Sequence, residues 1–152
     1  MFARAVVVCL YVHMKLRVAA IGKLKSKAIA ELVEDYSERI GHYMPFELTV
    51  AKDDASLKLD RDDFLVVCDE NGDQPSSKGL AEFLSQHQRV GTKRLTFFIG
   101  DAKGVMPVMK AKARATLSFS KMTFPHELAR VILLEQLYRA CTILRGEKYH
   151  YG

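Results

Sequence analysis

The chain has 152 residues, of which 49% are hydrophobic, a size that suits one domain with a single buried core. Its net charge of +5 fits a polyanionic partner such as nucleic acid, although an ordinary solvated basic surface explains the charge equally well. The three cysteines, Cys9, Cys68 and Cys141, are widely spaced in apolar runs, which excludes a disulfide framework and indicates a reducing, cytoplasmic location.

The first residues, "MFARAVVVCLYVHM", imitate a secretory signal with one arginine and a short apolar stretch. No small-residue cleavage site follows, and the apolar run falls short of the roughly 20 residues that a membrane helix needs. We interpret residues 1–13 as an N-terminal extension from an upstream start and residues 14–152 as a single domain. No membrane partner is expected.

Strand-like and helix-like segments alternate from Met14 onward. An apolar run predicts a strand over 16–21, and helical spacing predicts a helix over 27–40 that Gly41 closes. Alternation predicts a strand over 46–50. The charged residues 51–63 are expected to form a loop or a single helical turn.

The second half continues this alternation. The expected elements are a strand over 64–68, a helix over 76–90, a strand over 95–99, a basic helix with Lys110, Lys112 and Arg114, a strand over 116–119, and a final helix with Pro125 in its first turn that ends at Arg145-Gly146. Five strands alternating with helices predict an α/β fold, with a mainly parallel sheet and helices on both faces.

Ligands of such sheets bind beyond the carboxyl ends of the strands, here at 68–72, 100–104 and 118–124. The stretch "IGDAKG" lets backbone approach a ligand closely, because glycine lacks a Cβ. Its spacing matches neither the dinucleotide-binding nor the phosphate-loop pattern. A simple tight turn therefore remains the alternative.

The stretch "LSFSKMTFPH" combines hydrogen-bonding side chains with an apolar wall, in front of the unpaired N–H groups of a helix. The polar members are Ser118, Ser120 and Thr123, and the apolar members are Phe119, Met122 and Phe124. Such a helix entrance suits a carboxylate, a phosphate or a purine edge. The alternative is ordinary N-capping by Thr123.

The final helix is unusually apolar, with apolar side chains at 12 of the 17 positions 128–144. A homodimer partner would cover such a helix, and the alternative is a central core helix within one protomer. His126 and His150 lie near the predicted ligand loops and could move a proton. The tail "GEKYHYG" could stack on a base or be a frayed terminus. The histidines and cysteines lack metal-ligand spacing, so we expect no metal.

From Met14 onward the sequence resembles the RlmH family, SPOUT-class methyltransferases that act on pseudouridine in large-subunit ribosomal RNA. The resemblance rests on "MKLRVAAIGKLK", "DENG", "FFIGDAKG" and "LSFSKMTFPHELARVILLEQLYRACTILRGEKYH", in the family's order. It implies a C-terminal trefoil knot, a homodimer, and S-adenosylmethionine held in the knot. It further implies methylation of N3 of a pseudouridine in 23S rRNA, on assembled ribosomes.

The resemblance also implies site residues. The cofactor-binding positions are Cys68, Gly100, Phe119, Ser120, Lys121, Met122, Thr123 and Phe124. For the proposed methyl transfer we assign His126, His150 and Tyr149 as candidate catalytic residues, and Arg130, Arg139 and Arg145 as candidate RNA-binding residues.

Three residues depart from the family pattern. Asp101 stands where the family has a second glycine, Cys68 replaces an aliphatic residue, and Tyr151 replaces the usual Arg or Lys of the tail. If position 101 needed a positive φ, Asp would strain the turn. The alternative function is therefore a non-catalytic dimeric rRNA-binding assembly factor whose pocket Asp101 has spoiled.

Overall fold

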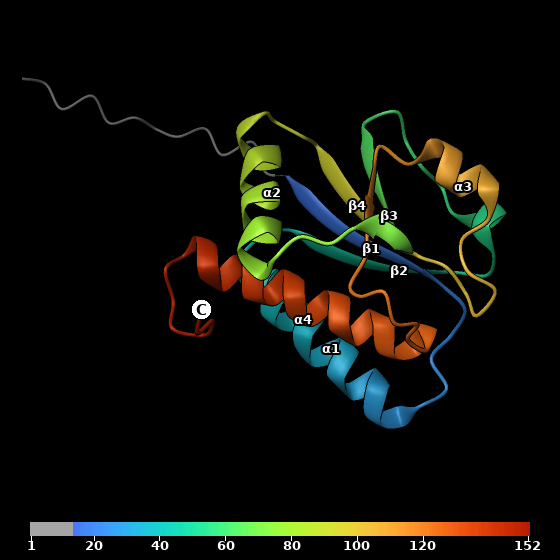
Figure 1. Ribbon diagram of the computed structural model, residues 1–152, viewed down its shortest axis with the longest axis horizontal. Helices are drawn as coiled ribbons and strands as arrows, with labels where there is room; N and C mark the ends of the chain where they lie inside the picture. The colour runs from blue at the N-terminus through green and yellow to red at the C-terminus, as the bar shows by residue number, and fades with distance from the viewer. Residues whose placement is uncertain (1–13) are drawn as a thin grey trace, which may run out of the picture.

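The computed structural model describes residues 14–152, so the interpretation of residues 1–13 as an extension lies outside the described residues. A five-stranded sheet, in which every neighbouring pair of strands is parallel, organises the fold in the order β2-β1-β4-β3-β5 (Figure 1). The strands are β1 (Lys15–Ile21), β2 (Phe46–Ala51), β3 (Asp63–Asp73), β4 (Arg94–Ile99) and β5 (Ala115–Leu117). This confirms the predicted α/β class with a parallel sheet.

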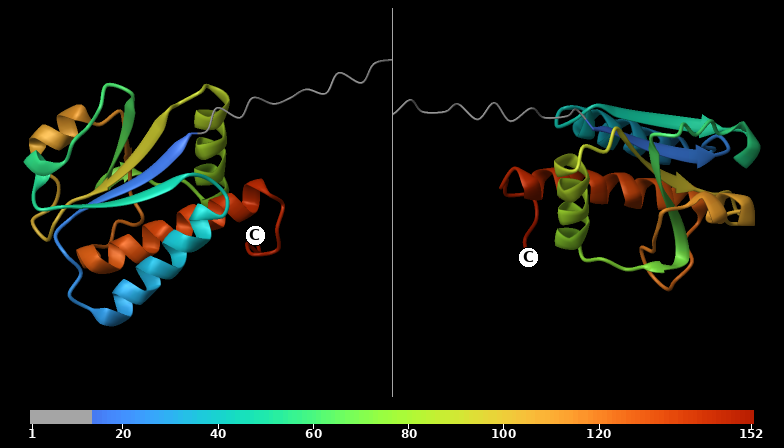
Figure 2. Two further views of the ribbon diagram at one scale, coloured as in Figure 1. Left: turned by 180° about the vertical axis from the view of Figure 1, so that it is seen from behind. Right: turned by 90° about the horizontal axis from the view of Figure 1, so that it is seen from above.

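Helices cover both faces of the sheet, but unequally. They are α1 (Lys27–Gly41), α2 (Ser77–Arg89), α3 (Pro107–Lys112) and α4 (His126–Leu144), with a short 3-10 helix η1 (Asp54–Ser56) in the charged segment 51–63. The three longer helices pack on one face, while α3 and the segment around η1 pack on the other (Figures 1 and 2). None of the helices in residues 14–152 is long and apolar enough to span a membrane. The trefoil knot stays a prediction.

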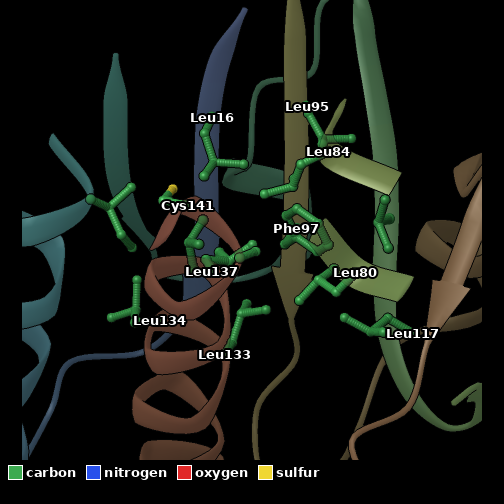
Figure 3. Packing of buried hydrophobic residues seen from close by; sticks show 14 of the residues in the cluster. Leu16, Leu80, Leu84, Leu95, Phe97, Leu117, Leu133, Leu134, Leu137 and Cys141 are labelled. Atoms are coloured by element: carbon green, nitrogen blue, oxygen red, sulfur yellow. The ribbon is translucent and has the colours of Figure 1, made fainter. Parts of the chain in front are cut away.

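The main core lies between the sheet and α2 and α4. Leu16, Leu95 and Phe97 of the sheet meet leucines of both helices, among them Leu137 of α4 and Leu84 of α2 (Figure 3). Helix α4 packs against α1 on one side and α2 on the other. Leu133, Leu134 and Leu137 are thus buried within one protomer, whereas Leu128 and Leu144 are at least 40% exposed, and the homodimer stays a prediction.

Strand β3 runs five residues beyond the predicted end at residue 68. Its register against β5 shifts, so that Cys68 and Asp73 both pair with Leu117. Gly72 allows this path, because a Cβ there would lie 2.8 Å from the backbone nitrogen of Leu117. Hydrophobic patterning missed the extension because residues 69–73 are polar, apart from the glycine, and their pairing depends on a close backbone contact.

Three other expected boundaries also differ. Arg114 lies outside α3, because Ala113 has extended backbone and ends the helix, and its guanidinium lies 5.2 Å from the Phe64 ring centre. Strand β5 ends at Leu117 rather than at residue 119. Pro125 is the N-cap of α4 and precedes the first turn instead of occupying it.

Candidate functional site

The three predicted strand-end loops meet around one pocket of about 430 Å³ at the carboxyl edge of the sheet. Its lining residues come from 68–71, 99–105 and 117–124, together with Lys110 of α3 and His126 and Ala129 of α4. The carboxyl ends of parallel strands lie on one edge of a sheet, which explains why three segments that are separate in the sequence converge here. The convergence of the loops, predicted from the sequence, is confirmed.

Backbone contact between two glycines shapes the loop after β4. A Cβ on Gly100 would lie only 2.4 Å from the carbonyl oxygen of Gly104, so no other residue fits without moving the loop. Gly104 takes the positive φ of this turn, at 88°. Asp101 has no positive φ, and its carboxylate accepts a hydrogen bond from the Lys103 N–H at 2.8 Å. The expected strain at Asp101 is therefore wrong, because Gly104 carries the left-handed conformation.

The second half of β3, which the sequence predicted as a loop, supplies an apolar wall and two carboxylates. Burial raises the pKa of the Cys68 thiol, so Cys68 is a neutral packing residue here. Asp69 forms an ion pair with Lys110 at 2.5 Å, and the hydrogen bond from Lys110 is the main reason that its pKa is lowered. This ion pair joins β3 to α3. Glu70 stands beside it on the pocket wall.

The hydroxyl groups of the 118–124 loop are used mainly to shape the loop itself. The Ser118 hydroxyl donates to the carbonyl of Ser120 at 2.9 Å, and the Ser120 hydroxyl accepts the Met122 N–H at 3.0 Å. Thr123 donates its hydroxyl to the Glu70 carboxylate at 3.1 Å. Helix α4 has no side-chain cap, so the interpretation of Thr123 as an N-cap is wrong. His126 and Ala129, in the first turn of α4, line the pocket.

Seven of the eight candidate cofactor residues line the pocket, all except Lys121, which is exposed and lies outside it. His126 also lines the pocket. Asp69, Glu70 and Lys103 also line the pocket and lie within the predicted ligand segments 68–72 and 100–104, although the sequence analysis gave them no individual role. Sequence reasoning missed Lys110, whose position depends on how α3 folds back.

The remaining candidate catalytic residues lie at the other end of α4. The Tyr149 hydroxyl donates to Glu135 at 3.2 Å, and the His150 Nδ1 lies 3.2 Å from a guanidinium nitrogen of Arg139. Burial is the main reason that the Tyr149 pKa is raised. Glu135 and Arg139 follow His126 by nine and thirteen residues, which is about 13 and about 20 Å along the helix axis. One protomer therefore does not bring His126 together with Tyr149 and His150.

The three candidate RNA-binding arginines have different environments. Arg130 is 1% exposed and donates from its guanidinium to the carbonyls of Ile21 and Gly22, each at 2.6 Å. Burial lowers the Arg130 pKa. Its assignment to RNA binding is corrected to a structural role, because its donors face the end of β1. Arg139 is partly buried and bonds Glu135, while Arg145 is exposed at the end of α4.

No group of three or more His, Cys, Asp or Glu residues within 14–152 is arranged to hold a metal ion. Of the cysteines that the structure describes, Cys68 and Cys141 are free thiols. Burial raises the pKa of Cys141 to about 12. Both thiols are therefore packing residues rather than nucleophiles.

Comparison with known proteins gives a consistent result. Residues 14–150 match a protein-family model described as a predicted SPOUT methyltransferase. The ribosomal RNA large subunit methyltransferase H of Koribacter versatilis is 47% identical over 145 residues, which cover 91% of this chain and 99% of that protein. Its counterpart from Coprothermobacter proteolyticus is 41% identical over 138 residues, covering 90% of this chain and 99% of that protein.

A solved structure shares the fold. The probable methylase family protein from Haemophilus influenzae Rd KW20 aligns with a TM-score of 0.54 over 92% of this chain and 71% of that chain. The sequence identity of 11% means that this likeness concerns the fold alone.

Proposed function

This chain belongs to the SPOUT methyltransferase family, and on that basis we propose that it methylates N3 of a pseudouridine in 23S rRNA, using S-adenosylmethionine on assembled ribosomes. One observation carries the proposal. Three segments from different strands meet at a single pocket, and seven of the eight residues that the family resemblance assigns to the cofactor line it.

The pocket fits the cofactor in size and in chemistry. Its volume of about 430 Å³ lies within the roughly 300–1,000 Å³ common for small-molecule sites. Cys68, Leu117 and Phe119 offer apolar surface to an adenosyl group, while Glu70 and Asp101 offer negative charge to a ligand with sulfonium and ammonium groups. When bound there, the cofactor would supply an electrophilic methyl carbon on a good leaving group.

The protein's main contribution would be alignment. Holding the uridine N3, the methyl carbon and the sulfur in line can lower a barrier by up to about 7–11 kcal/mol. The N3 proton also has to leave. We assign this task to His126, which lines the pocket, or to His150, with Tyr149 as a positioning group beside it.

These groups would meet only across a homodimer. The Tyr149 hydroxyl bonds Glu135, nine residues after His126 and about 13 Å away along the helix axis, so a second copy would have to supply Tyr149 and His150 to the pocket. Exposed leucines support a contact along these helices: Leu32 of α1 and Leu128 and Leu144 of α4 remain at least 40% exposed. Arg139 and Arg145 would then contact RNA beside the second pocket.

The test is transfer of a labelled methyl group to ribosomes from a strain that lacks the modification. We expect label in 23S rRNA, and more label with assembled subunits than with naked rRNA if the enzyme reads RNA shape. Absence of label in both substrates would exclude the enzyme.

The assembly-factor alternative loses its main support, because Asp101 does not strain the turn. Calorimetric titration with S-adenosylmethionine separates the two functions. Cofactor binding supports the enzyme, and its absence at millimolar cofactor supports the non-catalytic RNA binder.

A further inference from the structure

A second cleft lies at the opposite edge of the sheet, where α1 and α4 end. Its volume is about 290 Å³. The lining residues are Arg39, His42, Tyr43, Tyr138, Arg145 and Glu147, and we call this group the tyrosine–arginine cleft. It shares no residue with the cofactor pocket.

Two guanidinium groups lie over two aromatic rings in the cleft. The Arg39 Cζ lies 5.5 Å from the ring centre of Tyr138, and the Arg145 Cζ lies 5.1 Å from that of Tyr43. The two tyrosine rings meet edge to face, with their centres 6.1 Å apart. The planar groups therefore form one continuous, partly exposed surface.

The ends of two helices fix this surface in place. His42 is the C-cap of α1 and Arg145 is the C-cap of α4, positions at which a helix favours positive charge. Glu147 donates its backbone N–H to the Thr142 carbonyl at 3.0 Å. The Glu147 carboxylate accepts the Tyr43 hydroxyl at 2.5 Å. The cleft is thus held by backbone and side-chain bonds on both sides.

Within the part of the chain that the structure describes, one positive charge of the cleft is free for an anionic ligand. Arg39 pairs with Asp35 at 3.1 Å, and Glu147 keeps its negative charge while it accepts the Tyr43 hydroxyl. Arg145 forms no ion pair with any residue in 14–152 and is exposed. Aromatic rings and guanidinium planes stack on unpaired bases, and a guanidinium also bonds a phosphate through two donors.

We propose that the tyrosine–arginine cleft binds an unpaired nucleotide of an RNA, with its base against Tyr43 and its phosphate on Arg145. The proposal rests on the proposed function, because it takes RNA as the partner. The cleft lies at the far end of α4 from the pocket of the same protomer, so it would hold RNA without touching that cofactor. Its lining has no aliphatic side chain, which favours RNA over an apolar contact with a second protein copy.

The experiment measures anisotropy of a fluorescein-labelled oligouridine RNA with the full chain and four variants. Tyr43→Leu removes the ring, Tyr43→Phe retains it, and Arg145→Gln removes the exposed charge. Arg89→Gln is the matched control, since Arg89 is an exposed arginine at the end of α2, outside the cleft.

We expect Tyr43→Leu to weaken binding roughly tenfold, while Tyr43→Phe binds as the wild type does. Arg145→Gln should weaken binding and reduce the slope of log affinity against log salt by about 0.7, the value for one lost single-strand phosphate contact. Arg89→Gln should change neither quantity. A purely structural role for Arg145 would leave the salt slope unchanged.

The proposal would be overturned if Tyr43→Leu and Arg145→Gln bound oligouridine with the affinity and the salt dependence of the wild type. It would also be overturned if the wild type did not bind the oligouridine probe. A change of sedimentation mass in these variants would assign the cleft to a protein contact instead, which also overturns it. Cofactor titration of the same samples separates the two proposals. If the wild type does not bind S-adenosylmethionine, the proposed methyltransferase function fails. The proposed RNA site in the cleft is tested by the RNA-binding measurements alone.

Discussion

The two ends of α4 are built by different means. At the first turn, backbone makes the site: Gly100 touches Gly104, Gly72 touches Leu117, and the helix begins without a side-chain cap. Along the second half of the helix, side chains make the contacts, and the Glu135 carboxylate accepts hydrogen bonds from Arg139 and Tyr149. The first end forms a pocket of loops, and the second a surface of charged and aromatic groups. The comparison indicates that small ligands and RNA would be held at different ends of one helix.

The largest effect should come from filling the backbone contact at the first end. In Gly100→Ala the new Cβ would meet the Gly104 carbonyl, and the loop would have to move. A displacement of about 1 Å can cost 10²-fold in rate, so we expect methyl transfer to fall by about 100-fold in single-turnover measurements. Gly41→Ala is the control, because its Cβ would meet nothing within 4 Å. Equal methyl-transfer rates in Gly100→Ala and Gly41→Ala would contradict the claim that the Gly100–Gly104 backbone contact shapes the pocket.

The next largest effect should be that of Arg130→Met on the stability of the folded protein. The substitution leaves the carbonyls of Ile21 and Gly22 without their guanidinium partner. We expect the free energy of unfolding to fall by about 3 kcal/mol, measured by urea denaturation. If Arg130→Met had the stability of the wild type and a weaker salt dependence of RNA binding, Arg130 would be an RNA contact and not a structural residue.

A smaller, pH-dependent effect is expected from His87, at the amino edge of the sheet. Its ring packs 4.2 Å from Phe64 and 4.5 Å from Phe83, centre to centre, and burial is the main reason that its pKa is lowered from 6.5. The folded state therefore binds this proton less readily than the unfolded state does. The contribution to stability is fully present above the unfolded pKa and is lost as the pH falls through 6.5 toward the folded pKa.

Urea midpoints between about pH 7.5 and about pH 5.5 would measure this contribution. The wild type should lose more stability over that range than His87→Phe does, because the variant lacks the titrating group. Parallel pH profiles for the two proteins would contradict the assignment.

The smallest effect should be that of Lys121→Gln. Lys121 belongs to the sequence segment assigned to the cofactor, but its side chain is exposed and does not line the pocket. We expect the cofactor dissociation constant to change less than about twofold, in line with the small effects of exposed substitutions. A tenfold change in this dissociation constant would show that Lys121 contacts the cofactor. Side chains as well as backbone would then hold the ligand at the first end of α4.

The fold and the first end of α4 were readable from the sequence because both depend on local patterns. Alternating apolar segments located all five strands, and the parallel arrangement then placed the loops after residues 68, 99 and 117 on one edge. The extension of β3 and the role of Gly104 were not readable, since both arise from backbone contacts between segments. The burial of Arg130 was missed for a related reason, because its partners are backbone carbonyls more than 100 residues away.

The second end was harder to predict. The tyrosine–arginine cleft brings together Tyr43 after α1 with Tyr138 and the C-cap Arg145 of α4. These helices are far apart in the sequence, so no sequence spacing predicts the cluster. Tyr149 and His150 are candidates for the catalytic site, but the structure places them with Glu135 and Arg139. The family resemblance gives no information on whether Tyr149 and His150 act at the pocket of their own protomer or at that of a second copy.

The central claim is that the loops at the carboxyl edge form the cofactor site. Calorimetric titration with S-adenosylmethionine, carried out in parallel on the wild type, Gly100→Ala and Gly41→Ala, tests it most directly. The account predicts saturable binding to the wild type and to Gly41→Ala, and binding at least about tenfold weaker to Gly100→Ala. Equal affinity in all three proteins, or no binding to the wild type, would contradict it.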